Sequence, residues 1–270
     1  MNDGNITLDR IDNIAVVTLD RPDRHHSFND RMLTLLEEVT RELRKATPRA
    51  IVITGSGDRS FSAGFDVQPD NPMMKRLIDA VTAKDEVPAR EAISRIREVI
   101  DAFCSLPVPT IAALNGNAFG GGAELAVRCD LRVMVRGAFI CYSEVSLGLM
   151  PDHGGGAALP RLVGASRAAD LVLTGRRVGA EEALSMGLVS RICERGLALG
   201  EAVAMARAIA GNGPQAIRHS LALLRESRNR TYNESLAEES DRAVALIISG
   251  ECFHGVSAFL QKKKPVFPDI

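Results

Sequence analysis

Two glutamates placed twenty positions apart are the residues whose setting in this sequence best suits chemistry. Glu124 follows a glycine run, in the stretch FGGGAELA at 119–126. Glu144 lies in the stretch YSEVSLG at 142–148. Two carboxyl groups in different surroundings can divide the roles of acid and base between them. The two glutamates are therefore candidates for proton transfer.

The glycines at 120–122 add a second chemical element, because they open a helix predicted to end near Arg128. The first turn of a helix leaves N–H groups without intrahelical acceptors, and such groups bind anions. Taken alone, the glycines also suit tight packing, Glu124 suits the helix dipole, and Glu144 suits an exposed strand end. Together they predict proton transfer beside an oxyanion hole.

The hydrophobic pattern predicts the elements that hold these residues. Strands are expected at 6–10, 14–19, 50–54, 110–114, 131–135 and 138–140, and helices at 30–45, 89–105 and 120–128. Strands alternate with helices up to about residue 195, which indicates an α/β core. After that, only helical patterns occur, at 197–211, 214–228, 233–249 and 253–263. We therefore divide the chain into a core at 1–196 and a helical region at 197–270.

The stretch at 67–88 is the least regular part of the sequence. It carries three prolines and mixed charge, so we expect a mobile loop, or a lid with a short helix near 73–80.

Composition excludes several classes of function. The 270 residues carry a net charge of −1 and no tryptophan, which argues against binding nucleic acid or an anionic membrane surface. No apolar run approaches the ~18 residues that span a membrane, and no secretory signal is visible. The five cysteines form no C-x-x-C pair, which indicates reduced thiols and a cytoplasmic protein.

The sequence also lacks the usual marks of a metal or dinucleotide site. The five histidines, His153 among them, have no metal-ligand spacing, so each is expected to be a surface or satisfied histidine. The glycines at 55–57 follow a strand, but the third glycine of the dinucleotide fingerprint is missing. We expect no metal.

Several blocks carry a resemblance to a known family. They read FSAGFD at 61–66, NGNAFGGGAEL at 115–125, CDLR at 129–132, SEVSLGLMP at 143–151, LTG at 173–175 and AFLQKKKP at 258–265. In order and spacing they resemble the crotonase superfamily, whose best known members are enoyl-CoA hydratases and isomerases. The resemblance runs nearly from end to end of the chain.

The resemblance implies a spiral of ββα units followed by a helical trimerisation region, in homotrimers or dimers of trimers. It implies an acyl-CoA thioester as substrate, with no separate cofactor because CoA is part of the substrate. The backbone N–H groups of Phe65 and Gly121 match the oxyanion hole of the family. The positions that match substrate or CoA contacts are Arg24, Ala63, Asp66, Gly120 and, from a neighbouring subunit, Lys262.

In hydratases of this superfamily, glutamates match both Glu124 and Glu144. The resemblance implies that Glu124 orients and deprotonates a water that attacks the β carbon of a 2-trans-enoyl-CoA. Glu144 would then protonate the α carbon, giving a 3-hydroxyacyl-CoA. A thioester enolate needs aimed donors, and losing one such donor costs roughly 10²–10³ in rate.

The sequence departs from the hydratase pattern at Asp152, where hydratases commonly have glycine. Asp152 lies eight residues past Glu144, as in several isomerases of the superfamily. An enoyl-CoA or dienoyl-CoA isomerase that uses Glu144 and Asp152 is therefore the alternative, followed by a non-catalytic binding protein of the same fold. His26 replaces a usual asparagine beside Arg24, and Phe65 is bulkier than the more frequent alanine, which would narrow the acyl pocket.

Overall fold

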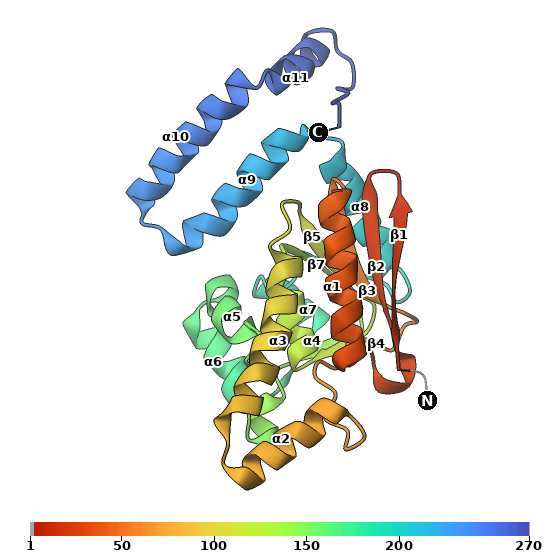
Figure 1. The fold of residues 1–270 in the computed structure, drawn as a ribbon. Helices are drawn as coiled ribbons and strands as arrows, with labels where there is room; N and C mark the ends of the chain where they lie inside the picture. Colours follow the sequence, from red (N-terminus) through yellow and green to blue (C-terminus); the bar gives the residue numbers. More distant parts are fainter. Residues whose placement is uncertain (1–2, 270) are drawn as a thin grey trace.

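Ten strands form two sheets in the part of the chain that the structure, a computed structural model, describes: residues 3–269 (Figure 1). The larger sheet has six strands in the order β1-β2-β3-β5-β7-β10. Their bounds are β1 (Asn5–Ile11), β2 (Ile14–Asp20), β3 (Ala50–Gly55), β5 (Thr110–Leu114), β7 (Leu131–Val135) and β10 (Arg191–Cys193). β1 and β2 form an antiparallel hairpin, and the later strands pair in parallel.

The first three strands of the smaller sheet each follow a strand of the larger one, and its last strand follows α6 (Ala165–Thr174). Its order is β4 (Ser60–Ser62), β6 (Asn117–Phe119), β8 (Phe139–Cys141) and β9 (Arg177–Gly179). The pairs β3–β4, β5–β6 and β7–β8 are each followed by helices. This repeating ββα unit is the predicted spiral, so the predicted fold class is confirmed.

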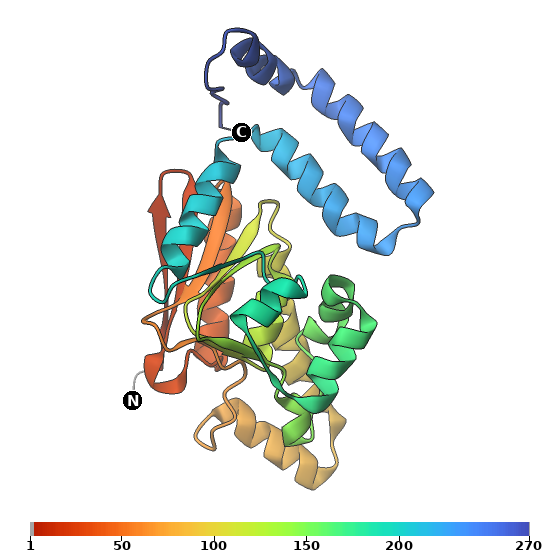
Figure 2. The same cartoon turned by 180° about the vertical axis from the view of Figure 1, so that it is seen from behind.

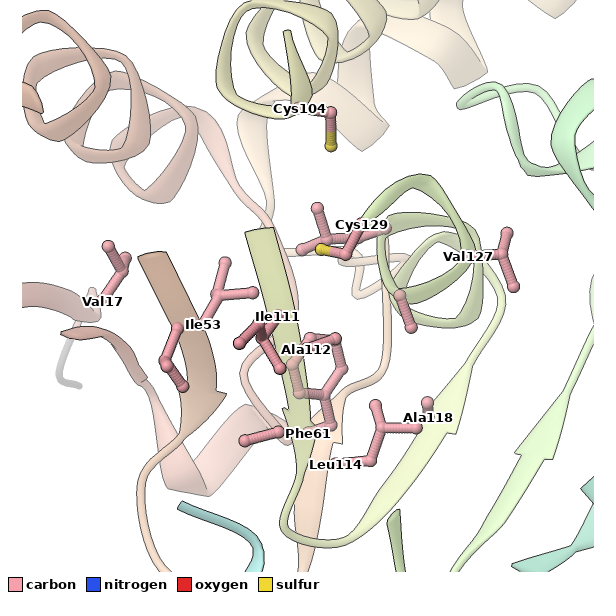
Figure 3. Close-up of a cluster of buried hydrophobic side chains, with 14 of the residues drawn as sticks. Val17, Ile53, Phe61, Cys104, Ile111, Ala112, Leu114, Ala118, Val127 and Cys129 are labelled. Carbon is pink, nitrogen blue, oxygen red and sulfur yellow. The ribbon is translucent and has the colours of Figure 1, made fainter. Parts of the chain in front are cut away.

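The core lies between the sheets and the helices that cover them. Figure 3 shows Ile53 of β3, Phe61 of β4 and Ile111 of β5 pointing into one cluster, and all three side chains are fully buried. α1 (Asp30–Lys45) covers one face of the larger sheet, and α8 (Ala198–Ala210) lies on the opposite face (Figure 2). The side chain of Asn29 caps α1 by accepting a hydrogen bond from the N–H of Met32.

The prediction of a loop at 67–88 is wrong, because most of this stretch is helical. The helix expected near 73–80 is present but longer, as α2 (Pro72–Ala83), and α3 (Glu86–Cys104) begins before the expected position 89. Asn71 and Asp85 cap the two helices with their side chains. Pro72 lies in the first turn of α2 and Pro88 in the first turn of α3, where a missing N–H leaves no helical hydrogen bond unmade.

The remaining α-helices of the core lie between residues 121 and 185 of the sequence. They are α4 (Gly121–Arg128), α5 (Gly155–Val163), α6 (Ala165–Thr174) and α7 (Ala180–Ser185), with the short turns η1 (Pro22–Arg24) and η2 (Glu144–Leu147). α4 begins at the predicted glycine run and ends at the predicted Arg128.

The last helices extend away from the core (Figures 1 and 2). They are α9 (Pro214–Glu226), α10 (Tyr232–Ile248) and α11 (Glu251–Leu260), with η3 (Ser227–Asn229) after α9. Arg225 ties α9 to the core through two hydrogen bonds of 2.6 and 2.8 Å to Asp130. Whereas the sequence places the start of the helical region at 197, α8 packs on the sheet, and the extended part begins after it.

Glu251 of α11 closes this helical unit. Its carboxylate accepts the N–H groups of Gln215 and Ala216 in the first turn of α9, at 2.9 and 2.8 Å. Within residues 3–269 no single helix is long and apolar enough to cross a membrane, although α10 and α11, which meet at a 73° bend, pass that test together.

Candidate active site

A cavity of about 900 Å³ opens between α2, α3 and the segment around η2. Its wall includes most of the residues predicted from the sequence. They are Ala63, Phe65, Gly120, Gly121, Glu124, Glu144 and Asp152. The structure therefore brings both glutamates, both predicted oxyanion donors and the third acid to one cavity.

Glu124 is fully buried in the first turn of α4, and backbone donors hold its carboxylate. Its Oε2 accepts the N–H groups of His153 and Gly155 at 2.9 and 2.7 Å, and its Oε1 accepts that of Asp152 at 3.2 Å. Burial raises the pKa of Glu124 to about 7, while nearby His153 acts in the opposite direction. The three N–H groups favour the ionised form of the carboxyl.

Glu144 is buried in a different environment at the start of η2. Within residues 3–269, neither of its carboxyl oxygens has a hydrogen-bond partner. Burial is the main cause that raises the pKa of Glu144, and the nearby Asp152 carboxylate acts in the same direction. Its own backbone N–H and the Glu124 carboxyl lower this pKa in part, but Glu144 lacks the three backbone donors that hold Glu124.

The two predicted oxyanion donors lie side by side because Gly64 lets the chains approach. A Cβ atom on Gly64 would lie 2.4 Å from the backbone nitrogen of Gly121, and Gly64 has a left-handed φ of +78°. This contact brings the backbone before Phe65 close to Gly121, and both Phe65 and Gly121 line the cavity. Neither N–H group donates a hydrogen bond within the described part of the chain.

The loop before α5 supplies the donors to Glu124, and its shape depends on close contacts. A Cβ atom on Gly155 would lie 2.4 Å from Cγ of Glu124. Arg128 donates to the carbonyl oxygen of His153 at 3.3 Å and forms an ion pair with Asp101 of α3. The loop is therefore fixed from both sides.

Three predicted contacts lie outside this cavity. Asp66 is buried in an ion pair with Arg21, with 2.6 Å between its Oδ2 and Nη1. Arg24 lines a separate, smaller hollow of about 120 Å³ that also includes Asp66, and it forms an ion pair with Asp70 at 2.7 Å. Lys262 follows α11, and α11 lies at the opposite end of the molecule from α2 (Figure 1).

His153 is the site residue that sequence reasoning missed. It was expected to be a surface or satisfied histidine, and this expectation is wrong: the residue is 5% exposed, and its Nδ1 has no hydrogen-bond partner among residues 3–269. Its Nε2 lies 3.2 Å from Oδ1 of Asp152. The one signal in the sequence was its place next to Asp152 in a glycine-rich loop.

The donor atoms of Glu124, Asp152 and His153 lie within 4.8 Å of one another, which is close enough to hold a metal ion. The carboxylate of Glu124, however, already accepts three backbone N–H groups. The set fits the holding and transfer of a proton better than the binding of a cation.

The arrangement suits reactions at the carbon next to a carbonyl group. Two N–H groups can stabilise negative charge on a carbonyl oxygen, and two buried carboxyl groups of unequal proton affinity can give and accept protons. Apolar side chains of α2 and α3 form the remaining wall.

Comparison with known proteins agrees with this chemistry. Residues 9–269 match the model of the enoyl-CoA hydratase/isomerase family. The chain is 33% identical to the crotonyl-CoA hydratase of Syntrophomonas wolfei, over 97% of each chain. It is 32% identical to the short-chain-enoyl-CoA hydratase of Clostridium acetobutylicum, over 96% of each. The crystal structure of an enoyl-CoA hydratase from Polaromonas superposes with a TM-score of 0.89 at 29% identity, covering 98% of this chain and all of that one.

The chain belongs to the enoyl-CoA hydratase/isomerase family, the crotonase superfamily. The resemblance seen in the sequence is thereby confirmed, and so is the expectation of an enzyme of this family, over the non-catalytic alternative.

Proposed function

We propose that this enzyme adds water to a 2-trans-enoyl-CoA and releases a 3-hydroxyacyl-CoA. The observation that supports the proposal is the unequal setting of the two acids: three N–H groups hold Glu124, and none holds Glu144. A carboxyl bound by donors serves as the base, and a buried carboxyl without donors serves as the acid.

In this mechanism the thioester oxygen lies between the N–H groups of Phe65 and Gly121. Glu124 accepts a proton from water, whose oxygen bonds to the β carbon as the double-bond electrons move to the thioester oxygen. Glu144 then gives its proton to the α carbon, and the carbonyl group re-forms. The proton on Glu124 must return to Glu144 before the next cycle, and the two carboxyl groups are close enough to interact.

The acyl chain of the substrate runs along an apolar groove between α2 and α3. The groove is lined by Met74, Leu77, Ile78, Val81, Ile93 and Ile96. A four-carbon acyl group fills only the end nearest the acids, whereas each further methylene contributes about 0.8 kcal/mol on burial. We therefore propose an unbranched, apolar acyl group longer than crotonyl as the preferred substrate.

The matched variants Leu77→Trp and Lys75→Trp test this preference. Leu77 lines the groove, whereas Lys75 is an exposed neighbour in α2 that does not. Leu77→Trp lowers kcat/KM for a decenoyl thioester and leaves crotonyl-CoA nearly unchanged, and Lys75→Trp changes neither. Equal losses on both substrates with Leu77→Trp contradict the proposed path of the chain.

Self-association is part of the proposal, because the helices beyond the core expose large apolar side chains. Ile248, Phe253, Phe259 and Leu260 of α10 and α11 are each between 72 and 80% exposed. Exposed apolar area of this kind marks an interface, and we propose a homotrimer or a dimer of trimers in which Lys262 of one subunit approaches CoA of another. Sedimentation equilibrium of the wild type against Phe253→Asp tests this, since a monomeric wild type contradicts it.

The setting of the cysteines supports a reducing compartment. The cysteines at 104, 129, 141, 193 and 252 are all free. A cytoplasmic location is therefore part of the proposal, and fractionation of the source cells tests it.

Isomerisation is the second candidate, because Asp152 lines the same cavity as Glu144. In that reaction Glu144 and Asp152 would move a proton between carbons without adding water.

A panel of acyl-CoA thioesters separates the two candidates. Hydration removes the absorbance of the conjugated 2-enoyl thioester and incorporates ¹⁸O from labelled water, and Glu124→Gln abolishes it. Conversion of 3-enoyl or dienoyl substrates, with no turnover of any 2-enoyl substrate, would replace hydration by isomerisation. Asp152→Asn sharpens the result, because it stops the isomerase but leaves the hydratase active.

A further inference from the structure

His153 is a buried histidine of the cavity wall to which the proposed hydration gives no role. Its ring lies between two carboxyl groups: Nε2 is 3.2 Å from Oδ1 of Asp152, and Nδ1 is 3.8 Å from Oε1 of Glu124. Within residues 3–269 the Nδ1 atom has no hydrogen-bond partner. A buried polar atom left unpaired lowers stability, so its position calls for a reason.

The same ring packs against the predicted oxyanion hole. A Cβ atom on Gly121 would lie 2.3 Å from Nδ1 of His153, so only glycine leaves room for the imidazole here. The ring therefore touches both the backbone that would bind the thioester oxygen and the side chain that would act as base.

We propose that His153 is a positioning residue: Asp152 holds its ring, and the ring keeps Glu124 ready to accept the proton of the attacking water. This inference rests on the proposed function. The Asp152 carboxylate accepts the Nε2–H, which fixes the ring orientation and leaves Nδ1 facing Glu124.

The groups around Glu124 act on its pKa in opposite directions. Burial raises the pKa of Glu124 most, and the carboxyl groups of Glu144 and Asp152 raise it further, whereas His153 lowers it. The other groups that face this set are the buried hydroxyl of Tyr142, at the end of β8, and Arg128 of α4, whose charge is shared with Asp101 of α3. His153 is thus the group of this set that lowers the pKa of Glu124 and favours its ionised form.

The kinetic test compares His153→Gln and His153→Ala with the wild type between pH 5.5 and 9. His219→Gln is the matched control, since His219 is a half-buried histidine of α9 whose Nδ1 also lacks a hydrogen-bond partner among the described residues. Because His153 lowers the pKa of Glu124, its removal should raise that pKa, by about one unit. The acid limb of kcat/KM therefore moves up by about one pH unit, a roughly tenfold loss at pH 6 that nearly disappears by pH 9.

A purely structural role gives a different pattern. The same loss at every pH, or no loss in either variant, overturns the inference. A normal profile for His219→Gln shows that the shift belongs to the position and not to the removal of a histidine.

A second measurement needs no turnover. In protein labelled with ¹³C at the glutamate carboxyl carbons, the signal of Glu124 is the one absent from Glu124→Gln, and its midpoint is followed by NMR against pH. We expect a higher midpoint in His153→Gln than in the wild type. If the midpoint moves but no enoyl-CoA is turned over, the proposed hydration fails, and only the effect of His153 on the proton affinity of Glu124 is supported; an unmoved midpoint in an active enzyme overturns the inference alone.

Discussion

Replacing Gly155 by alanine should displace Glu124, the proposed base, without changing that residue itself. The nitrogen of Gly155 donates the shortest of the three hydrogen bonds to Glu124, at 2.7 Å. An added Cβ would lie 2.4, 2.7 and 2.8 Å from Cγ, Cβ and Cα of Glu124. Carbon atoms pack at about 3.5–4.0 Å, so the two residues must separate by about 1 Å or more.

The expected loss follows from this displacement. A misplacement of about 1 Å in a catalytic group can lower the rate about 100-fold. Overpacking of this kind also lowers the free energy of unfolding by about 1–3 kcal/mol. Because the acyl groove between α2 and α3 is untouched, kcat should fall about 100-fold while KM changes little.

Two other glycines, Gly156 next to Gly155 and Gly179 in β9, provide a graded control. At Gly156 the nearest atom to an added Cβ is the carbonyl oxygen of Pro151, at 3.1 Å, so alanine there requires a small adjustment. At Gly179 no heavy atom lies within 4 Å, so alanine should be neutral. The assay follows enoyl-thioester absorbance for kcat and KM, and urea unfolding for stability. A Gly155→Ala enzyme with kcat within threefold of the wild type would refute the reasoning.

Three further outcomes are expected. Because burial raises the pKa of Glu124 to about 7 and only the ionised form accepts a proton, kcat/KM should fall as pH drops through about 7; a profile flat from pH 5 to 9 contradicts this. Arg225→Ala leaves the part-buried carboxylate of Asp130 without its bidentate partner, and urea unfolding should show a loss of about 1–3 kcal/mol. A Cβ atom on Gly200 of α8 would meet no heavy atom within 4 Å, so Gly200→Ala should raise the free energy of unfolding by about 0.5–1 kcal/mol; a loss of stability would contradict this.

The fold was predictable where the pattern is local. The apolar run at β3 and the 3–4 residue spacing of buried side chains in α1 are visible in the sequence, and both elements formed as expected. The prediction of a loop at 67–88 is wrong because prolines and mixed charge do not exclude helices. Asn71 caps α2 directly before Pro72, and Asp85 caps α3, whose first turn contains Pro88. A proline in the first turn is compatible with a helix.

The electrostatics of the site were not predictable, because they depend on pairs far apart in the chain. Glu124 and the N–H group of Gly155 are 31 positions apart, and no local sequence pattern predicts the hydrogen bond between them. The orientation of His153 likewise depends on Asp152 beside it and on the absence of a side chain at Gly121.

Asp152 was the residue that weakened the case for hydration, and the structure changes how it bears on that case. Its bond to Glu124 comes from the backbone N–H, which any residue other than proline provides. An aspartate at position 152 in place of glycine therefore keeps this hydrogen bond to Glu124. The side chain instead lies against His153, with 3.2 Å between its Oδ1 and Nε2 of the ring. An acid in that position can tune the base through the imidazole without joining the reaction, so its presence is compatible with a hydratase, and the Asp152→Asn variant decides between tuning and catalysis.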